Sequence, residues 1–216
     1  MDEVQVHSVP TIIHGRVLVR PARAAAARGV LVGFHGYKEN AALQMKRLEG
    51  IPGAAAWTLV AIQGLHRLYR GRTDEVVASW MTREDREDAI ADNLAYVAAA
   101  LDLAPHDRAS RVVYAGFSQG VPMAFRAAMR GRDGAAAVIA VGGDVPPELL
   151  SDAATVFPPV LLLRGSRDVE WYTQAKHDAD VTALTARGAK FQTLVYDGAH
   201  EWNEAVAAAI AAFIRE

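Results

Sequence analysis

Segments typical of buried β-strands alternate with segments typical of helices along most of the chain. Continuous apolar runs, the pattern of strands buried on both faces, occupy residues 29–34, 57–62, 111–116, 135–141, 159–163 and 190–196. Helix-like segments lie between or after them, including residues 123–130, 172–187 and 202–214. Such an alternation requires a mostly parallel, doubly wound sheet with helices on both faces, so we expect an α/β fold.

Three segments add detail to this pattern. Residues 4–9 and 12–20 predict an antiparallel N-terminal hairpin with its turn near Pro10. Residues 63–81 are irregular and rich in Arg, His and aromatic side chains, and connections this long in a compact domain are usually functional. A helix is expected after them, with Thr82 as its N-cap.

Composition favours one domain and excludes several classes of function. A chain of 216 residues without repeats or linkers supports a single domain over residues 1–216. The net charge is −2, and no basic stripe or basic amphipathic helix indicates nucleic acid or a membrane as a partner. Because the sequence has no cysteine, disulfides, thiolate metal sites and a cysteine nucleophile are excluded. We expect a cytoplasmic protein, since the acidic N-terminus lacks signal-peptide features and no apolar run is long enough to span a bilayer.

Residues 116–120 read Gly-Phe-Ser-Gln-Gly at the end of a strand-like run. A serine at the apex of a tight strand-to-helix turn has a strained backbone, and Gly116 and Gly120 remove the side chains that would collide there. Pro122 follows in the first helical turn, where its missing N–H costs nothing. The pattern fits G-x-S-x-G and predicts that Ser118 is a nucleophile. The alternative is an ordinary turn with a solvated serine.

Polar residues at other strand ends supply partners for this serine. Ligands of an open parallel sheet bind outside the carboxyl ends of its strands, where Ser118, Asp168 and His200 are all expected. His200 would take the serine proton at neutral pH, and Asp168 would orient and stabilise the imidazole. Glu170 and Asp197 compete with Asp168 for the acid position.

Backbone N–H groups are predicted to bind the oxyanion of a tetrahedral intermediate. One belongs to Gln119, directly after the nucleophile, and the other to Tyr37, in the loop after residues 29–34. Four side chains are candidates for a substrate-binding surface: His35, Tyr69, Trp80 and Trp171. His35 could instead cap a strand end, and Trp80 could anchor its loop to the core. The alternative for Trp171 is packing.

Three residues of types that bind metals lie close together in the second half of the sequence. His177 lies close in sequence to Asp178 and Asp180 within a helix-like segment. A zinc site needs three or four convergent ligands, so we interpret this cluster as a solvated helix face. No metal is expected.

Nearly the whole chain resembles the serine esterases of the α/β-hydrolase superfamily. The nearest resemblance is to small bacterial phospholipase/carboxylesterase proteins, relatives of acyl-protein thioesterases. The resemblance is carried by His35-Gly36-Tyr37, Gly116-Phe117-Ser118-Gln119-Gly120, Gly165-Ser166-Arg167-Asp168 and Asp197-Gly198-Ala199-His200-Glu201-Trp202. It implies an α/β-hydrolase fold, ester or thioester hydrolysis through an acyl-serine without metal or cofactor, and a triad of Ser118, Asp168 and His200. Many relatives have His-Gly where this chain has Arg164-Gly165, which weakens the subfamily assignment.

We therefore expect a serine carboxylesterase or thioesterase that acts on a small-molecule, short- to medium-chain acyl ester as a monomer or homodimer. Only 17 residues separate the runs 135–141 and 159–163, where a lid is usually inserted. The site should thus be open, with residues 63–81 as its variable wall. The alternatives are a peptidase or amidase with the same triad, or a non-catalytic binding protein, although such proteins usually lose triad members.

Overall fold

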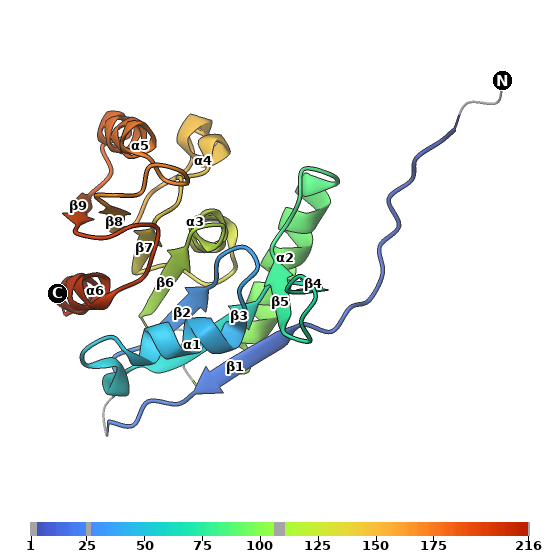
Figure 1. The fold of residues 1–216 in the computed structure, drawn as a ribbon, viewed down its shortest axis with the longest axis horizontal. Helices are drawn as coiled ribbons and strands as arrows, with labels where there is room; N and C mark the ends of the chain where they lie inside the picture. Colours follow the sequence, from blue (N-terminus) through green and yellow to red (C-terminus); the bar gives the residue numbers. More distant parts are fainter. Residues whose placement is uncertain (1–3, 25–26, 106–110, 216) are drawn as a thin grey trace.

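The main sheet is mostly parallel, as the alternating pattern predicts (Figure 1). The computed structural model describes residues 4–24, 27–105 and 111–215, and in them the sheet has the order β1-β3-β2-β6-β7-β8-β9. Only β1 runs antiparallel to its neighbour, β3. The strands are β1 (Arg16–Arg20), β2 (Val30–Phe34), β3 (Thr58–Gln63), β6 (Val112–Phe117), β7 (Ala137–Val141), β8 (Val160–Gly165) and β9 (Phe191–Tyr196). The predicted α/β-hydrolase fold is confirmed.

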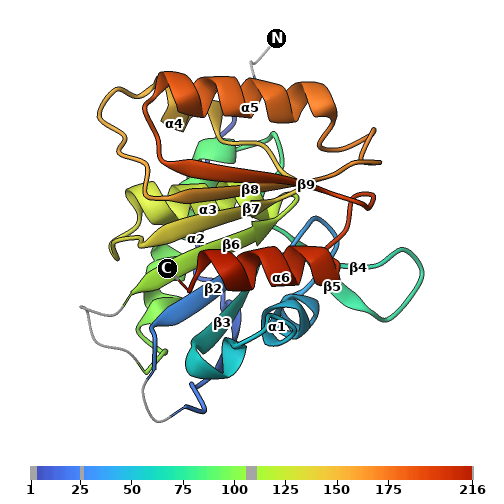
Figure 2. The ribbon, with the colours of Figure 1, turned by 90° about the vertical axis from the view of Figure 1, so that its left-hand side faces the viewer.

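Helices cover both faces of the sheet because the central strands are apolar on both sides. Every residue of β2, β3, β6, β7 and β8 is buried. One face packs against α1 (Ala41–Glu49) and α6 (Glu204–Phe213), which Figure 2 shows side by side in front of the sheet. The opposite face packs against α2 (Arg86–Leu101), α3 (Gly120–Arg130), α4 (Pro147–Ser151) and α5 (Gln174–Ala186). No described helix is long and apolar enough to cross a membrane.

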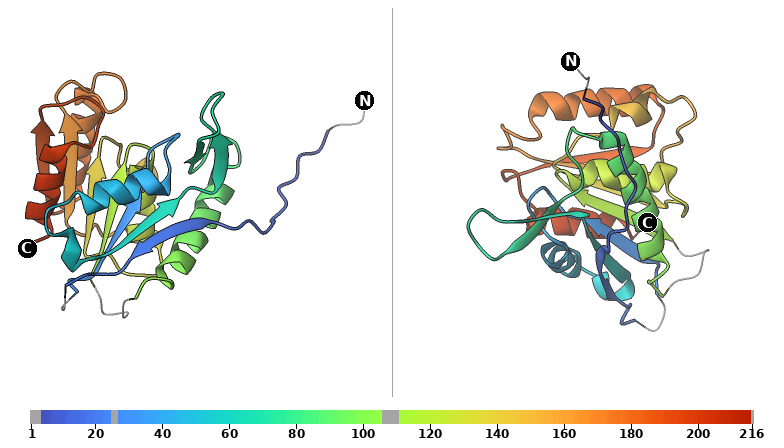
Figure 3. Two further views of the ribbon diagram at one scale, coloured as in Figure 1. Left: turned by 60° about the horizontal axis from the view of Figure 1, so that its bottom comes forward. Right: turned by 90° about the vertical axis from the view of Figure 1, so that its right-hand side faces the viewer.

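The N-terminal hairpin predicted from residues 4–9 and 12–20 does not form. Residues 4–15 contain no strand and run away from the sheet (Figures 1 and 3), and only β1 remains of the expected pair. The apolar residues of this segment are exposed, Val6 by 89% and Ile12 by 92%. Alternation alone misled the prediction, because β1 takes β3 as its antiparallel partner.

Residues 63–81 are more regular than the sequence indicated. They contain the antiparallel pair β4 (His66–Tyr69) and β5 (Val76–Ser79), and an isolated bridge between Glu39 and Ala78 joins β5 to the loop after β2. The hairpin therefore lies beside the loop in which an oxyanion donor is expected.

The start of α2 also differs from the prediction. The helix begins at Arg86, and its N-cap is Asp85, which has a left-handed φ of 46°. Thr82 accepts a hydrogen bond from the Glu84 N–H at 3.2 Å, so its hydroxyl closes a local turn instead of capping the helix.

Candidate active site

Ser118 lies in the sharp turn between β6 and α3, next to the centre of the sheet. Its φ is +51°, in the left-handed region that non-glycine residues rarely adopt. Its N–H donates to the Val141 carbonyl at the end of β7 (2.9 Å), and its carbonyl accepts from the Val121 N–H (2.9 Å). These bonds hold the strained residue at the carboxyl end of the sheet.

The two glycines of the motif are required by close backbone contacts. A Cβ on Gly116 would lie 2.5 Å from the Gly120 carbonyl oxygen, and a Cβ on Gly120 would lie 2.2 Å from the Phe34 carbonyl oxygen. Real Cβ atoms do not approach backbone so closely, and here the colliding atoms cannot move aside. The strand–turn–helix geometry predicted from the motif is therefore the one observed.

Asp168 and His200 meet at the ends of β8 and β9. The Asp168 Oδ2 and His200 Nδ1 atoms are 2.6 Å apart, and Asp168 is buried. Its other oxygen, Oδ1, accepts the N–H groups of Trp171 (3.1 Å) and Tyr172 (3.2 Å). Burial alone would raise the pKa of the Asp168 carboxyl, but the hydrogen bond from His200, these N–H groups and the imidazole charge outweigh it and lower that pKa. An ionised Asp168 can only accept, so Nδ1 carries a proton and Nε2 of the neutral ring is the acceptor.

The loops that carry the acid and the base are tied together by backbone hydrogen bonds. The Ser166 N–H donates to the Tyr196 carbonyl and the Arg167 N–H to the Gly198 carbonyl, both at 2.8 Å. A Cβ on Gly165 would lie 2.1 Å from the Ala199 carbonyl oxygen, so glycine permits this close approach. The Asp168–His200 distance is thus fixed by main-chain contacts as well as by its own bond.

The competing acids lie elsewhere. Asp197 is exposed, its side chain by 85%, and it pairs with Arg167. Glu170 is exposed. Of the three candidates, the structure brings only Asp168 to His200.

His200 reaches the serine turn through Phe117 and Gly142. Its ring centroid is 5.0 Å from that of Phe117, which directly precedes Ser118. A Cβ on Gly142 would lie 3.1 Å from His200 Cε1. No hydrogen bond joins Ser118 to His200 among the described residues. Such bonds are often long before substrate binds and tighten afterwards.

The predicted oxyanion donors are both available. Among the described residues, the backbone N–H groups of Tyr37 and Gln119 have no hydrogen-bond acceptor. Their neighbours are engaged: the Gly36 N–H donates to Glu39 Oε2 (2.8 Å) and the Lys38 N–H to the Ala78 carbonyl (3.0 Å). Because β2 and β6 are adjacent strands, the two free donors belong to neighbouring loops.

Trp80 connects these two loops. Its backbone N–H donates to Gln119 Oε1 (3.1 Å), and its indole N–H donates to the His35 carbonyl (2.8 Å). Gln119 Nε2 also donates to Ser79 Oγ (3.0 Å) and the Met81 carbonyl (3.1 Å). Trp80 is fully buried, so of its two alternatives the structure favours the anchoring one.

His35 is also a support for the loop. It is fully buried, its Nδ1 lies 2.7 Å from the Gly36 carbonyl, and its Nε2 accepts the Gly64 N–H at 3.0 Å. Burial lowers the pKa of this imidazole, which favours the neutral ring that these bonds require. The predicted substrate contact is therefore not available to this side chain. Tyr69 and Trp171, by contrast, are 64% and 57% exposed, and the Trp171 ring lies 6.1 Å from that of His200.

Arg164 has a role that sequence reasoning missed. Its buried guanidinium donates from Nη1 to the carbonyls of Gly165 (2.8 Å) and Asp168 (3.3 Å), and from Nη2 to Gln174 Oε1. These bonds hold the loop that carries Asp168, which explains why a charged residue lies at the end of a buried strand. That charge within an apolar run was the available signal.

The interpretation of His177 and Asp180 as a solvated face is wrong. Both are buried. His177 contacts Thr193 (2.6 Å), and Asp180 accepts from the Tyr172 hydroxyl (2.8 Å) and the Val145 N–H (3.2 Å). Burial raises the pKa of Asp180 to about 6. Within the described part of the chain, no group of three His, Cys, Asp or Glu side chains could hold a metal ion.

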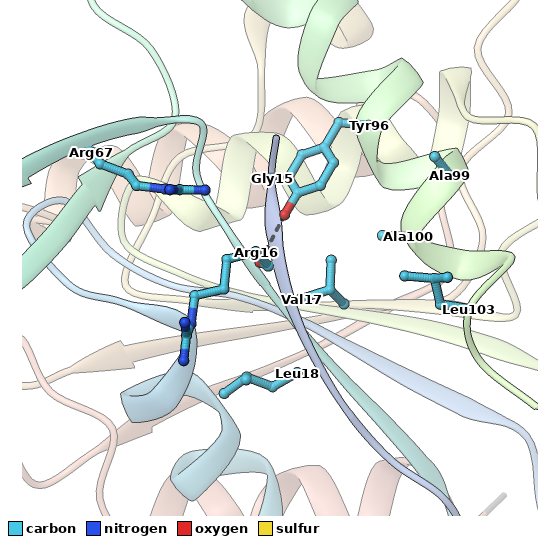
Figure 4. Close-up of a pocket in the computed structure, with 9 residues that line it drawn as sticks. All are labelled: Gly15, Arg16, Val17, Leu18, Arg67, Tyr96, Ala99, Ala100 and Leu103. Carbon is cyan, nitrogen blue, oxygen red and sulfur yellow. Dashed lines mark hydrogen bonds between the residues drawn. The ribbon is translucent and has the colours of Figure 1, made fainter. Parts of the chain in front are cut away.

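A large cavity lies away from these residues. It has a volume of about 640 Å³ between β1 and α2, where the Tyr96 hydroxyl donates to the Arg16 carbonyl at 2.8 Å (Figure 4). Arg67 and Leu103 also line it, but Ser118, Asp168 and His200 do not. The chemistry of the strand ends, and not cavity size, locates the candidate active site.

Comparison with known protein families agrees with this geometry. The model of a family described as the dienelactone hydrolase family matches residues 64–207, two thirds of the chain. The chain belongs to the dienelactone hydrolase family. The matched range includes Ser118, Asp168 and His200.

Esterases and thioesterases are among the solved structures with a similar fold. Esterase PE8 has a TM-score of 0.71 at 22% identity, over 94% of this chain and 99% of that chain. Acyl-protein thioesterase 2 from Zea mays has a TM-score of 0.69 at 18% identity, over 94% and 98%. A phospholipase/carboxylesterase from Dyadobacter fermentans has a TM-score of 0.68 at 18% identity, over 94% and 97%. At these identities the similarity shows the fold alone. None of the curated proteins compared matches this dienelactone hydrolase family member.

Proposed function

We propose that this protein is a serine carboxylesterase or thioesterase that hydrolyses short- to medium-chain acyl esters through an acyl-serine intermediate. The observation that carries the proposal is the Asp168–His200 hydrogen bond, next to a turn that holds Ser118 at a φ of +51°. Family membership supports ester hydrolysis, and the side chains supply the nucleophile, the base and its orienting acid.

The proposed reaction begins with attack of Ser118 Oγ on the acyl carbonyl carbon. His200 Nε2 takes the hydroxyl proton as the new C–O bond forms, and the carbonyl electron pair moves onto oxygen. Asp168 stabilises the resulting imidazolium through Nδ1. The free N–H groups of Tyr37 and Gln119 donate hydrogen bonds to the oxyanion. Loss of one such donor typically lowers the rate by about 10²–10³.

Collapse of this intermediate breaks the bond to the alcohol or thiol. The leaving group takes the proton from His200, which leaves the acyl group on Ser118. Water then attacks the acyl-serine while His200 again removes a proton. The second collapse returns that proton to Ser118 and releases a carboxylic acid. Every proton transfer thus uses groups of this chain, and the substrate is the only partner that the proposal requires.

The preference for shorter acyl groups rests on the absence of a large lid. Between β7 and β8 the chain forms one helix of five residues, α4, so nothing larger is inserted there. Trp171, beside His200, is 57% exposed, and Tyr37 of the donor loop is 53% exposed. A site without a lid offers less apolar surface to a long acyl chain than a covered one would.

A substrate panel tests this proposal. We expect kcat/KM for p-nitrophenyl acetate, butyrate or octanoate to exceed that for palmitate, and matched thioesters to be hydrolysed as well. Ser118→Ala is the matched control and should lose turnover of all of them. A clear palmitate optimum would contradict the chain-length preference. Faster cleavage of p-nitroanilides than of the corresponding esters would favour the amidase alternative.

A further inference from the structure

A partly buried ion pair lies next to the proposed oxyanion site. Glu39 follows the donor loop after β2, and Arg47 lies on α1. Arg47 Nη1 donates to Glu39 Oε2 (2.6 Å) and Nη2 donates to Oε1 (2.8 Å), which makes the pair bidentate. Their side chains are only 13% and 16% exposed, unlike those of ordinary surface pairs. Bidentate pairs combine strength with a fixed geometry.

The carboxylate of this pair holds the donor loop. Glu39 Oε2 accepts the Gly36 N–H at 2.8 Å, and the Glu39 N–H donates back to the Gly36 carbonyl at 3.2 Å. The loop is closed on the other side by bonds to β5, since Ala78 N–H donates to the Glu39 carbonyl at 2.7 Å. Tyr37, whose N–H is the proposed donor, lies between these contacts. Its direction is therefore set by where the Glu39 carboxylate lies.

The guanidinium of the pair contacts Phe117, which in turn contacts the base. Arg47 Cζ lies 4.2 Å from the centroid of the Phe117 ring, within the range of a cation–π contact. The ring of Phe117 also lies 5.0 Å from the His200 ring. A Cβ on Gly36 would lie 3.0 Å from both Phe117 Cδ1 and Glu39 Oε2, so the donor loop packs directly onto this arrangement.

The Glu39 carboxylate stays ionised at neutral pH. Burial opposes ionisation of Glu39, but the hydrogen bonds and charge of Arg47 and the Gly36 N–H outweigh it and lower the pKa of that carboxyl. Only a planar guanidinium can bind both carboxylate oxygens through its edge while its face lies on a ring; an ammonium cannot do both.

We propose that Glu39 and Arg47 form a positioning pair for the oxyanion site. The carboxylate aims the Tyr37 N–H, and the guanidinium face holds Phe117 and, through it, the orientation of His200. The inference rests on the proposed serine esterase function, which it deepens by adding two residues that touch neither the substrate nor the reacting atoms.

Kinetics and inhibitor binding test the pair separately from stability. Arg47→Met and Glu39→Gln should lower kcat roughly 10- to 100-fold, because small misplacements of catalytic groups have effects of this size. KM should change less than about threefold, since the ground-state ester makes no use of the oxyanion donors. Affinity for an aryl trifluoromethyl ketone, which binds as an oxyanion on the serine, should fall by the same factor as kcat. Arg47→Lys keeps the charge but should not restore kcat.

Arg132→Met is the matched control, because Arg132 also makes a bidentate pair. Its partner is Asp102, the C-cap of α2, at 2.6 and 3.1 Å. Rates are expressed per active site titrated, so loss of folded protein does not count as loss of kcat. Should Arg47→Met fail to fold, the milder Arg47→Lys and Glu39→Gln variants decide the matter.

The outcomes separate this inference from the function on which it rests. Normal Ser118-dependent turnover in the wild type, with kcat and ketone affinity of the pair variants within about twofold, would overturn the inference alone. A folded wild type without Ser118-dependent turnover would overturn the proposed function and the inference with it. A matched loss of kcat and ketone affinity in both pair variants, with the Arg132 control unchanged, would support the inference.

Discussion

Replacing Asp168 by Asn isolates the role of the acid, because the structure determines how the new amide must lie. Oδ1 accepts hydrogen bonds from two N–H groups, the partly buried one of Trp171 and the buried one of Tyr172, while Oδ2 faces His200 Nδ1. The amide oxygen of Asn would still accept hydrogen bonds from these two N–H groups. Its NH₂ group would then face Nδ1 as a donor and move the imidazole proton to Nε2. In that tautomer His200 cannot accept the serine proton.

The size of the effect follows from these contacts. Turning the amide restores the correct tautomer but points an NH₂ group at the two N–H donors. Each then loses its acceptor at about 1–3 kcal/mol, so roughly 2–6 kcal/mol in total. That corresponds to a loss of about 30-fold to 2 × 10⁴-fold in rate. Loss of the charge that stabilises the imidazolium adds to it, so we expect kcat to fall by about 10⁴.

The assay compares kcat for p-nitrophenyl butyrate between Asp168→Asn and Asp197→Asn. Asp197 is also next to the base loop, but it is exposed and pairs with Arg167. We expect the Asp197 variant to stay within about twofold of wild type, and both variants to unfold cooperatively. If Asp168→Asn retained kcat within tenfold of wild type, the tautomer argument would be refuted. The opposite ranking of the two variants would transfer the acid role to Asp197.

Two further predictions concern groups around the site. Asp180→Asn should flatten the pH dependence of stability. The pKa of Asp180, about 6 in the folded state, lies above its unfolded value, so the folded state binds the carboxyl proton more tightly. The stability that this proton contributes, roughly 3 kcal/mol, is present below about pH 4 and is lost as pH rises through 6. Thermal unfolding of variant and wild type from pH 4 to 8 measures this, and parallel curves would contradict it. Trp80→Phe removes the indole N–H that binds the His35 carbonyl, so Tm should fall by several degrees and kcat by roughly tenfold, with little change in KM. An unchanged kcat in the folded variant would show that Trp80 does not align the two donor loops.

The part of the site that could be predicted from the sequence is the part fixed by local sterics and chain order. Gly116 and Gly120 flank Ser118 because backbone atoms leave no room for a Cβ there, and such requirements are visible in five consecutive residues. The topology then follows from alternating elements, and it places the ends of β8 and β9 side by side. Chain order therefore brings an acid to His200, but only the folded structure distinguishes Asp168 from Glu170 and Asp197.

The supporting contacts could not be predicted because they depend on tertiary structure. Glu39 and Arg47 are eight positions apart across a helix start, so no helical or strand period relates them. The burial of Asp180 is not visible in the sequence, since its hydroxyl partner, Tyr172, and its amide partner, Val145, come from outside its own helix. The prediction of an N-terminal hairpin was wrong for the same reason, since β1 pairs with β3 and not with the residues that precede it.

In the proposed mechanism, Ser118 is a nucleophile activated by His200. The most direct measurement is labelling of the folded protein with a fluorophosphonate, followed by mass-spectrometric identification of the modified residue. We predict one label per chain, on Ser118, with none in Ser118→Ala and a labelling rate lowered by at least 10³ in His200→Ala. A folded wild type that remains unlabelled, or a label on a residue other than Ser118, would contradict the account.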